Sequence, residues 1–146
     1  MADNLTLEQQ YQEQVIRLAG AQRMLKVVHG DRVNVWDSLT KMLANLQGIS
    51  SPAVKEAALE FSNTPGGDAV AAFDRLSAAI EAYRPEAENN GEGELLAKLE
   101  RILHRLLGHH SKLSKQEAEL DREAMQYRAE ALRIKALLEK GPGGIH

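Results

Sequence analysis

The sequence predicts an all-α protein in which a small N-terminal bundle of three to four helices is followed by a long, coiled-coil-like C-terminal helix. Apolar residues recur three, four or seven positions apart along much of the chain, which is the spacing of helices with one buried face. Aromatic residues make up only 4% of the 146 residues, and a core built from leucine, valine, isoleucine and alanine suits helices better than strands.

The first helix is expected to begin around Leu5 to Leu7, because Thr6 and Gln9 have the spacing of a capping box. Its apolar stripe comprises Leu7, Tyr11, Val15, Leu18, Leu25 and Val28. Near Gly30 we expect a bend or break, followed by a second helix that ends at Gly48. The alternative for residues 26–36 is a β-hairpin with valine-rich arms.

Two shorter helices complete the predicted bundle. Ser51 is expected to cap the third helix, with Pro52 at its first position, where a missing N–H is tolerated. Residues 63–67 form a predicted turn, and Asp68 is expected to cap the fourth helix. The stripe of this fourth helix consists of Phe73, Leu76, Ile80 and Tyr83.

These elements predict four segments along the chain. The bundle spans residues 1–84 and is expected to stop at Pro85. Residues 85–93 read as an acidic, glycine-containing linker. The long amphipathic helix then spans residues 94–140, and residues 141–146 form a flexible tail.

The long helix carries apolar residues at two interleaved seven-residue repeats, the a and d positions of a coiled coil. At about 1.5 Å per residue it is about 65–70 Å long, more than a core of this size is expected to cover. It is therefore expected to form homo-oligomers or to dock on other proteins. We call its repeat positions the seam: Leu96, Leu99, Leu103, Leu106, His110, Leu113, Glu117, Leu120, Ala124, Tyr127, Ala131, Ile134 and Leu138.

His110 and Glu117 occupy seam positions where leucine is expected. One interpretation is that the seam is interrupted there, through a bend near Gly108 or a change of partner helix. The other is that the two polar residues set the register or the choice of partner, as buried polar residues do in some coiled coils.

A basic stripe runs along the same helix and is a candidate contact for phosphate groups or another anionic surface. The alternative is an ordinary solvated face, since no aromatic residue interleaves for base stacking and the chain has a net charge of −3. The basic stripe comprises Lys98, Arg101, Arg105, His109, Lys112 and Lys115.

Several functional classes lack support in the sequence. The absence of cysteine excludes disulfides, thiolate metal sites and a cysteine nucleophile. His104, His109 and His110 lack the spacing by which two imidazoles on one helix chelate a metal. No phosphate-binding glycine loop, catalytic constellation, signal peptide or membrane span is evident. We therefore expect a cytoplasmic, non-enzymatic protein without a cofactor, metal or small-molecule substrate.

The function that fits these features is that of a structural or assembly subunit, which uses the long helix within a larger complex such as a phage particle or a secretion apparatus. One alternative is a small dimeric DNA-binding or regulatory protein that presents the basic stripe. Another is an adaptor or chaperone whose long helix binds a partner helix.

Overall fold

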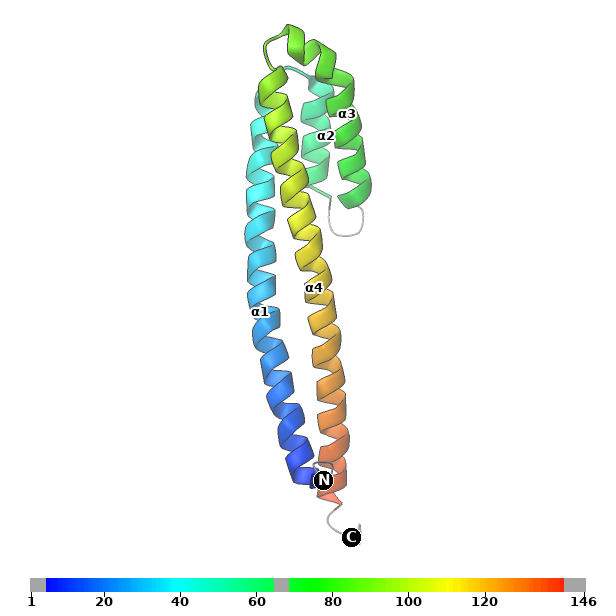
Figure 1. Ribbon diagram of the computed structural model, residues 1–146. Helices are drawn as coiled ribbons and strands as arrows, with labels where there is room; N and C mark the ends of the chain where they lie inside the picture. Colours follow the sequence, from blue (N-terminus) through cyan, green and yellow to red (C-terminus); the bar gives the residue numbers. More distant parts are fainter. Residues whose placement is uncertain (1–4, 65–68, 141–146) are drawn as a thin grey trace. The chain divides into compact units, whose positions relative to one another are not determined.

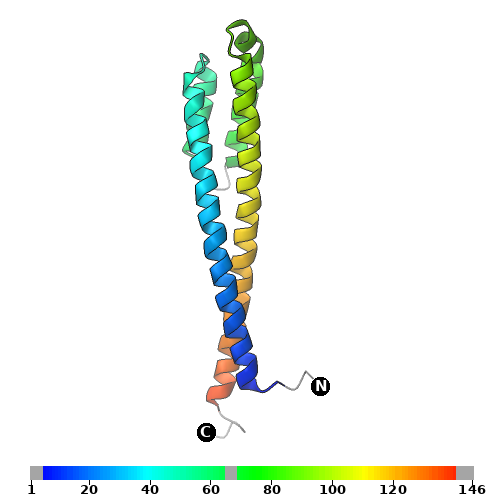
Figure 2. The same ribbon diagram turned by 60° about the vertical axis from the view of Figure 1, so that its left-hand side comes forward.

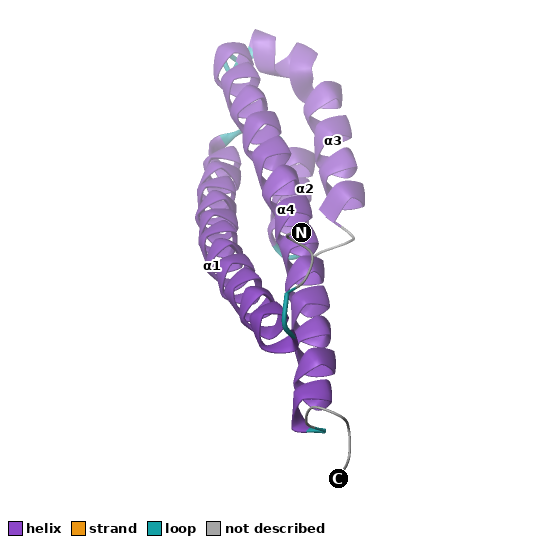
Figure 3. Cartoon of the chain, turned by 60° about the horizontal axis from the view of Figure 1, so that its bottom comes forward, coloured by secondary structure: helices purple, strands orange, loops and turns teal. Residues whose placement is uncertain are grey.

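A computed structural model describes residues 5–64 and 69–140 of the chain (Figure 3). The chain folds into α1 (Leu7–Asn45), the 3-10 turn η1 (Leu46–Gly48), α2 (Pro52–Ser62), α3 (Ala69–Asn89) and α4 (Gly93–Glu139). No strand occurs among the described residues. The predicted all-α class and the long C-terminal helix, which has 47 residues, are confirmed.

The chain forms two compact units, and each takes one segment from α1 and one from α4 (Figure 1). We call Val33–Ser111 the bundle unit. Met1–Arg32 together with Lys112–His146 is the two-helix unit. These limits do not follow the predicted segments, because residues 93–111 of α4 belong to the bundle unit.

In the two-helix unit, the N-terminal part of α1 runs antiparallel beside the C-terminal part of α4 (Figure 2). The predicted capping box starts α1: the Thr6 N–H donates to Gln9 Oε1 at 3.0 Å, and the Gln9 N–H donates to Thr6 Oγ1 at 3.1 Å. The buried side of α1 has a spacing of alternately three and four residues, which matches that of the α4 seam. Its residues are Tyr11, Gln14, Leu18, Ala21, Leu25, Val28 and Arg32.

The bundle unit holds the main hydrophobic core, to which every helix contributes. Leu39 and Leu43 come from α1, and Phe61 comes from α2. The predicted α3 stripe supplies Leu76, Ile80 and Tyr83, all buried, with Phe73 packed against them. The predicted cap of α2 is confirmed, since the Val54 N–H donates to Ser51 Oγ at 3.3 Å.

A row of rings joins the four helical segments of the bundle unit. The Trp36 ring lies 5.9 Å from Phe61 and 5.0 Å from His110. The Phe73 ring lies 5.7 Å from Phe61 and 5.1 Å from His104. The row therefore begins and ends on α4 and passes through α1, α2 and α3. The two Phe73 pairs are edge-to-face, an arrangement that adds to the stabilisation from burial.

A tight turn joins α3 to α4. Gly91 has φ of 75°, the left-handed conformation that glycine adopts without steric cost. The Glu92 N–H donates to the Ala87 carbonyl at 2.7 Å and the Gly91 N–H to the Glu88 carbonyl at 3.4 Å, which is the Schellman pattern of helix ends. The Glu92 carboxylate accepts from the Ser50 N–H at 3.1 Å and from the Tyr83 hydroxyl, so it ties this turn to the loop before α2.

Two predicted interruptions of the helices are wrong. Neither a break nor a hairpin occurs at residues 26–36, because α1 continues through Gly30. The α3 helix continues through Pro85 to Asn89, so most of the predicted linker 85–93 is helical. The buried Ala87 and the turn at Gly91 hold this last part of α3 in place. The predicted cap at Asp68 and the tail 141–146 lie outside the described residues.

Candidate functional site

The seam of α4 is covered by helices of the same chain. In the bundle unit, Leu96, Leu99 and Leu103 are buried in the core, and Leu106 packs against that core. In the two-helix unit, Leu113, Ala124, Ala131 and Ile134 are buried. The other seam residues are half-buried: His110, Glu117, Leu120, Tyr127 and Leu138. The expectation that a core of this size leaves the seam uncovered was wrong, because α1 is also a long helix with matching spacing.

The polar seam residue Glu117 has partners on α1. Arg32 Nε donates to Glu117 Oε2 at 2.8 Å, and His29 Nδ1 lies 3.2 Å from the same oxygen. The side chains of Arg32 and Glu117 are each 26% exposed. The Arg32 hydrogen bond, together with the contact from His29, lowers the pKa of Glu117 below its ordinary value of 4.5. Glu117 is therefore ionised at neutral pH, and its charge is compensated within the unit.

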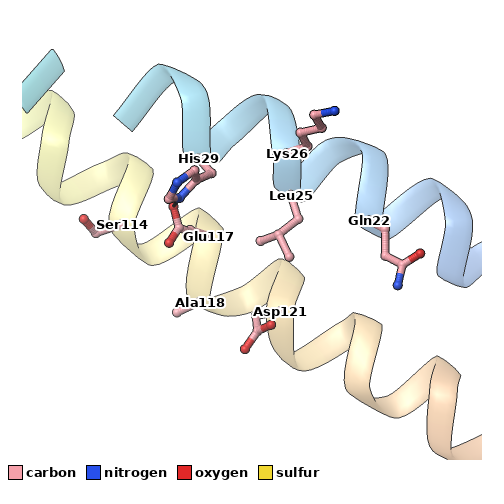
Figure 4. A pocket seen from close by; sticks show the side chains of 8 residues that line it. All are labelled: Gln22, Leu25, Lys26, His29, Ser114, Glu117, Ala118 and Asp121. Carbon is pink, nitrogen blue, oxygen red and sulfur yellow. Dashed lines mark hydrogen bonds and ion pairs between the residues drawn. The ribbon is translucent and has the colours of Figure 1, made fainter. Parts of the chain in front are cut away.

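A shallow groove of about 520 Å³ opens beside this cluster, within the two-helix unit (Figure 4). The side chains of His29 and Glu117 point toward each other across it, whereas that of Lys26 points away from α4. The groove is lined by Gln22, Leu25, Lys26 and His29 of α1 and by Ser114, Glu117, Ala118 and Asp121 of α4. The ionised Glu117 accepts a hydrogen bond from Arg32 beside this groove. An ion pair of this kind fixes the register of α1 against α4 within the two-helix unit.

His110 is the second polar residue of the seam, and it lies in the bundle unit. Its ring packs against Trp36 with a centroid distance of 5.0 Å and an interplanar angle of 48°. An imidazole presents a flat, largely apolar surface to such a contact. The two polar seam positions thus have different neighbours, a tryptophan ring at His110 and an arginine at Glu117.

The basic stripe is exposed along its whole length. Lys98, Arg101, Arg105 and His109 lie in the bundle unit, and Lys112 and Lys115 lie in the two-helix unit. None of the six forms an ion pair with a residue that the structure describes. Glu100, on the same stretch of α4, is bound instead by Arg84 of α3 at 2.8 Å.

Both helices of the two-helix unit expose large apolar side chains. On α1, Ile16 is 67% exposed and Val27 is 57% exposed. On α4, Met125 is 65% exposed and Leu132 is 59% exposed. Met125 and Leu132 belong to a set of exposed α4 residues spaced alternately three and four apart, which we call the outer stripe: Arg122, Met125, Ala129, Leu132, Ala136 and Glu139.

Comparisons of the chain with protein-family models, with curated proteins and with solved structures give no match. Across residues 5–64 and 69–140, no group of three or more His, Cys, Asp or Glu side chains is placed to hold a metal ion. Within the same ranges, no helix combines the length and apolar character needed to cross a membrane.

Sequence reasoning placed Glu117 in the seam but missed Arg32 and His29 as its partners. The signal was present in α1, where Arg32 follows Val28 by four residues and continues the same alternating spacing. The break expected near Gly30 assigned Val28 and Arg32 to different elements, so Arg32 was not counted in the buried side of α1. The outer stripe was missed for a different reason. It holds only two large apolar residues, Met125 and Leu132, and the stronger apolar repeat of the same helix is the seam.

Proposed function

We propose that this chain is a non-enzymatic structural or assembly subunit that works by binding other proteins through the exposed faces of its helices. The observation that carries the proposal is the exposure of Ile16, Val27, Met125 and Leu132, each more than half exposed in the two-helix unit. Met125 and Leu132 carry most of this argument, because they are seven residues apart on one side of α4, and apolar residues repeated along an exposed surface are typical of protein-binding sites, whereas scattered single ones need no explanation. The arrangement of the seam adds support, because the matched spacing of α1 and α4 buries one side of α4 within the chain and leaves the outer stripe exposed.

The proposal assigns different tasks to the two sides of α4. The seam holds α4 against the chain's own helices, and the outer stripe is left for partners. This differs from the expectation that the seam itself is the oligomerisation surface, and it follows from the burial of Leu96, Leu103 and Ile134 at 0%, 1% and 1% exposure.

The experiment is a mass measurement on the protein from the cell that makes it. A gently prepared extract is fractionated by size, the chain is detected with an antibody, and its fractions are cross-linked and analysed by mass spectrometry. A structural subunit is expected in particles or complexes well above 16.1 kDa, with cross-links from the two-helix unit to another chain. Elution of all the protein at the monomer mass, without such cross-links, would contradict the proposal.

A second candidate is an anion-binding or DNA-binding protein, and the exposure of all six basic-stripe residues favours it. A protein that neutralises several phosphates loses affinity steeply as salt rises. Retention on double-stranded DNA at about 50 mM salt that disappears near about 200 mM, and that weakens in an Arg101→Glu, Arg105→Glu variant, would support this function. A stable complex with one other protein at a ratio of one to one would instead indicate the adaptor alternative.

A further inference from the structure

We infer that the outer stripe of α4 is a surface for a second copy of this chain, which packs against it as an antiparallel helix related by a two-fold axis. The inference deepens the proposed function, because it names the partner for one exposed face. It starts from the order of residues along the outer stripe: a cation, a large apolar residue, a small residue, a large apolar residue, a small residue and an anion.

This order is complementary to itself when it is read in the opposite direction. If Arg122 of one chain faces Glu139 of the other, Met125 faces Ala136 and Ala129 faces Leu132. The two-fold axis repeats each contact, so every large side chain meets an alanine and each cation meets an anion. Two-fold interfaces between identical chains require this kind of self-complementarity. Alanine at the facing position gives each large residue a place to insert.

The exposure and charge of these residues agree with the inference. All six are exposed in the single chain, and Met125 and Leu132 are among the most exposed large apolar residues described. Neither Arg122 nor Glu139 is in an ion pair with a described residue. The charges at the two ends of the stripe are thus available for each other across a two-fold axis.

The charged pairs at the two edges of this contact have opposite effects on the dimer. On one edge, Glu119 comes near Lys140 of the second copy in the same register, which is a favourable pair. On the other edge, Arg128 comes near Lys135 of the second copy, and these cations repel each other. The central contact must therefore supply most of the binding free energy. Six residues a side is fewer than the roughly 20 to 30 of standard interfaces, so we expect a dimer that dissociates in the micromolar range.

The first test exchanges the charges at the ends of the stripe and measures dimerisation by sedimentation equilibrium between about 1 and 500 µM. Arg122→Glu alone and Glu139→Arg alone each create two like-charge contacts per dimer and are expected to weaken the dimer roughly tenfold. The combined Arg122→Glu, Glu139→Arg variant is expected to restore it. Arg23→Glu, at an exposed position of α1, changes the net charge as Arg122→Glu does and is expected to leave the dimer unchanged.

The second test uses the absence of cysteine from the chain. In one helix, residues 125 and 136 are about 16 Å apart, too far for a disulfide within the chain. In the antiparallel dimer each lies opposite the other, so the Met125→Cys, Ala136→Cys variant is expected to form covalent dimers under mild oxidation, while each single variant is not. Circular dichroism of every variant checks that the helices are retained.

The outcomes separate this inference from the proposed function. Cross-linking of the single Met125→Cys variant would show a parallel dimer and overturn the inference, as would a purified chain that stays monomeric at the highest concentration tested. Failure of the combined charge exchange to restore a dimer weakened by both single exchanges would also overturn it. A purified monomer that is nevertheless found in large complexes in the cell extract would leave the proposed function standing without this surface.

Discussion

Arg32 Nε donates a hydrogen bond to Glu117 Oε2 at 2.8 Å, so the charged residue in the α4 seam meets a charged residue on the buried side of α1. Each side chain is 26% exposed, which places the pair between a surface ion pair and a fully buried one. Such pairs contribute little net stability compared with apolar residues of similar size, but removal of one partner is costly. The pair therefore favours one register of α1 against α4 more than it raises the free energy of unfolding.

The first prediction concerns the removal of one or both members of this pair. Glu117→Leu removes the carboxylate that neutralises the half-buried Arg32 guanidinium, which then contacts only His29, and is expected to lower the free energy of unfolding by about 1 to 2 kcal/mol. The double variant Arg32→Leu, Glu117→Leu completes an apolar seam and is expected to be at least as stable as the wild type. Urea denaturation followed by circular dichroism measures both.

A matched control for this prediction is the exposed pair of Glu130 and Arg133 on α4. Glu130→Ala is expected to change the free energy of unfolding by less than about 0.5 kcal/mol, since surface pairs contribute little. If the double seam variant were less stable than the wild type, the ion pair would have to stabilise the fold by more than apolar packing does.

The second prediction concerns pH. Arg32 lowers the pKa of Glu117 below its ordinary value of 4.5, so the folded protein holds this carboxylate in its charged form more strongly than the unfolded chain does. The stability contributed by Glu117 is therefore complete above pH 4.5 and is lost as pH falls through the lower pKa of the folded state. Glu117→Gln is expected to be less stable than the wild type at neutral pH. The difference in stability is expected to shrink as pH falls from 4.5 through the pKa of Glu117 in the folded state.

The measurement compares urea midpoints of the two proteins at about pH 7 and at about pH 3. Other carboxylates with lowered pKa values, Glu81, Glu92 and Glu130, titrate in both proteins and cancel in the comparison. His29 contacts the same oxygen of Glu117, so His29→Gln in both backgrounds separates its contribution. A difference between wild type and Glu117→Gln that stayed constant over this range would show that the carboxylate is not specially stabilised by Arg32.

Much of the fold could be predicted from the sequence because local chemistry determined it. The capping box at Thr6 and the cap at Ser51 formed as expected, since each needs only residues three positions away. The α3 stripe and the α4 seam were also predictable, because their spacing alone identifies the buried face. These features require no knowledge of what packs against them.

The incorrect predictions concern places where packing outweighed local preference. Gly30 favours a break in the helix. The buried side of α1 nevertheless continues from Val28, before the glycine, to Arg32, after it, and burial of that side keeps the helix intact. Pro85 removes one hydrogen bond from α3. The helix continues to Asn89 because Ala87 is buried after the proline and the Schellman turn at Gly91 closes the end of the helix. Sequence spacing shows that Glu117 lies in the seam, but only the fold shows which residue of α1 meets it.

The third prediction concerns the ionisation of Tyr83. Its hydroxyl donates to the Glu92 carboxylate, and this hydrogen bond, together with burial, raises the pKa of Tyr83 above its ordinary value of 10.0. The chain has three tyrosines, so their ionisation can be followed by ultraviolet absorbance. Tyr83→Phe is expected to remove a phenol that ionises at high pH, and Glu92→Gln is expected to bring the pKa of Tyr83 back toward 10.0.

The same contact contributes stability that is present below pH 10.0 and is lost as pH rises through the raised pKa of Tyr83. The Tyr83→Phe variant lacks this titration, so its stability is expected to fall less than that of the wild type at alkaline pH. In the Glu92→Gln background, the same substitution should make a smaller difference to alkaline stability. An unchanged absorbance titration in Glu92→Gln would show that burial, and not the carboxylate, raises the pKa.

The fourth prediction contrasts two glycines that differ in conformation. Gly91 has φ of 75°, and an alanine there is expected to cost roughly 1 kcal/mol or more because its Cβ disfavours the left-handed region. Gly30 lies inside α1, and a Cβ built on it meets no atom within 4 Å apart from the adjoining backbone of its own helix. Gly30→Ala is therefore expected to raise the free energy of unfolding by about 0.5 to 1 kcal/mol, since alanine favours the helix and restricts the unfolded chain.

Thermal and urea denaturation of Gly30→Ala and Gly91→Ala measure these opposite effects in one protein. The Gly30 result also tests the continuity of α1, because a helix that broke at residue 30 would not gain from alanine there. A loss of stability in Gly30→Ala would mean that residue 30 leaves the helical conformation, and that α1 is two helices joined by a turn.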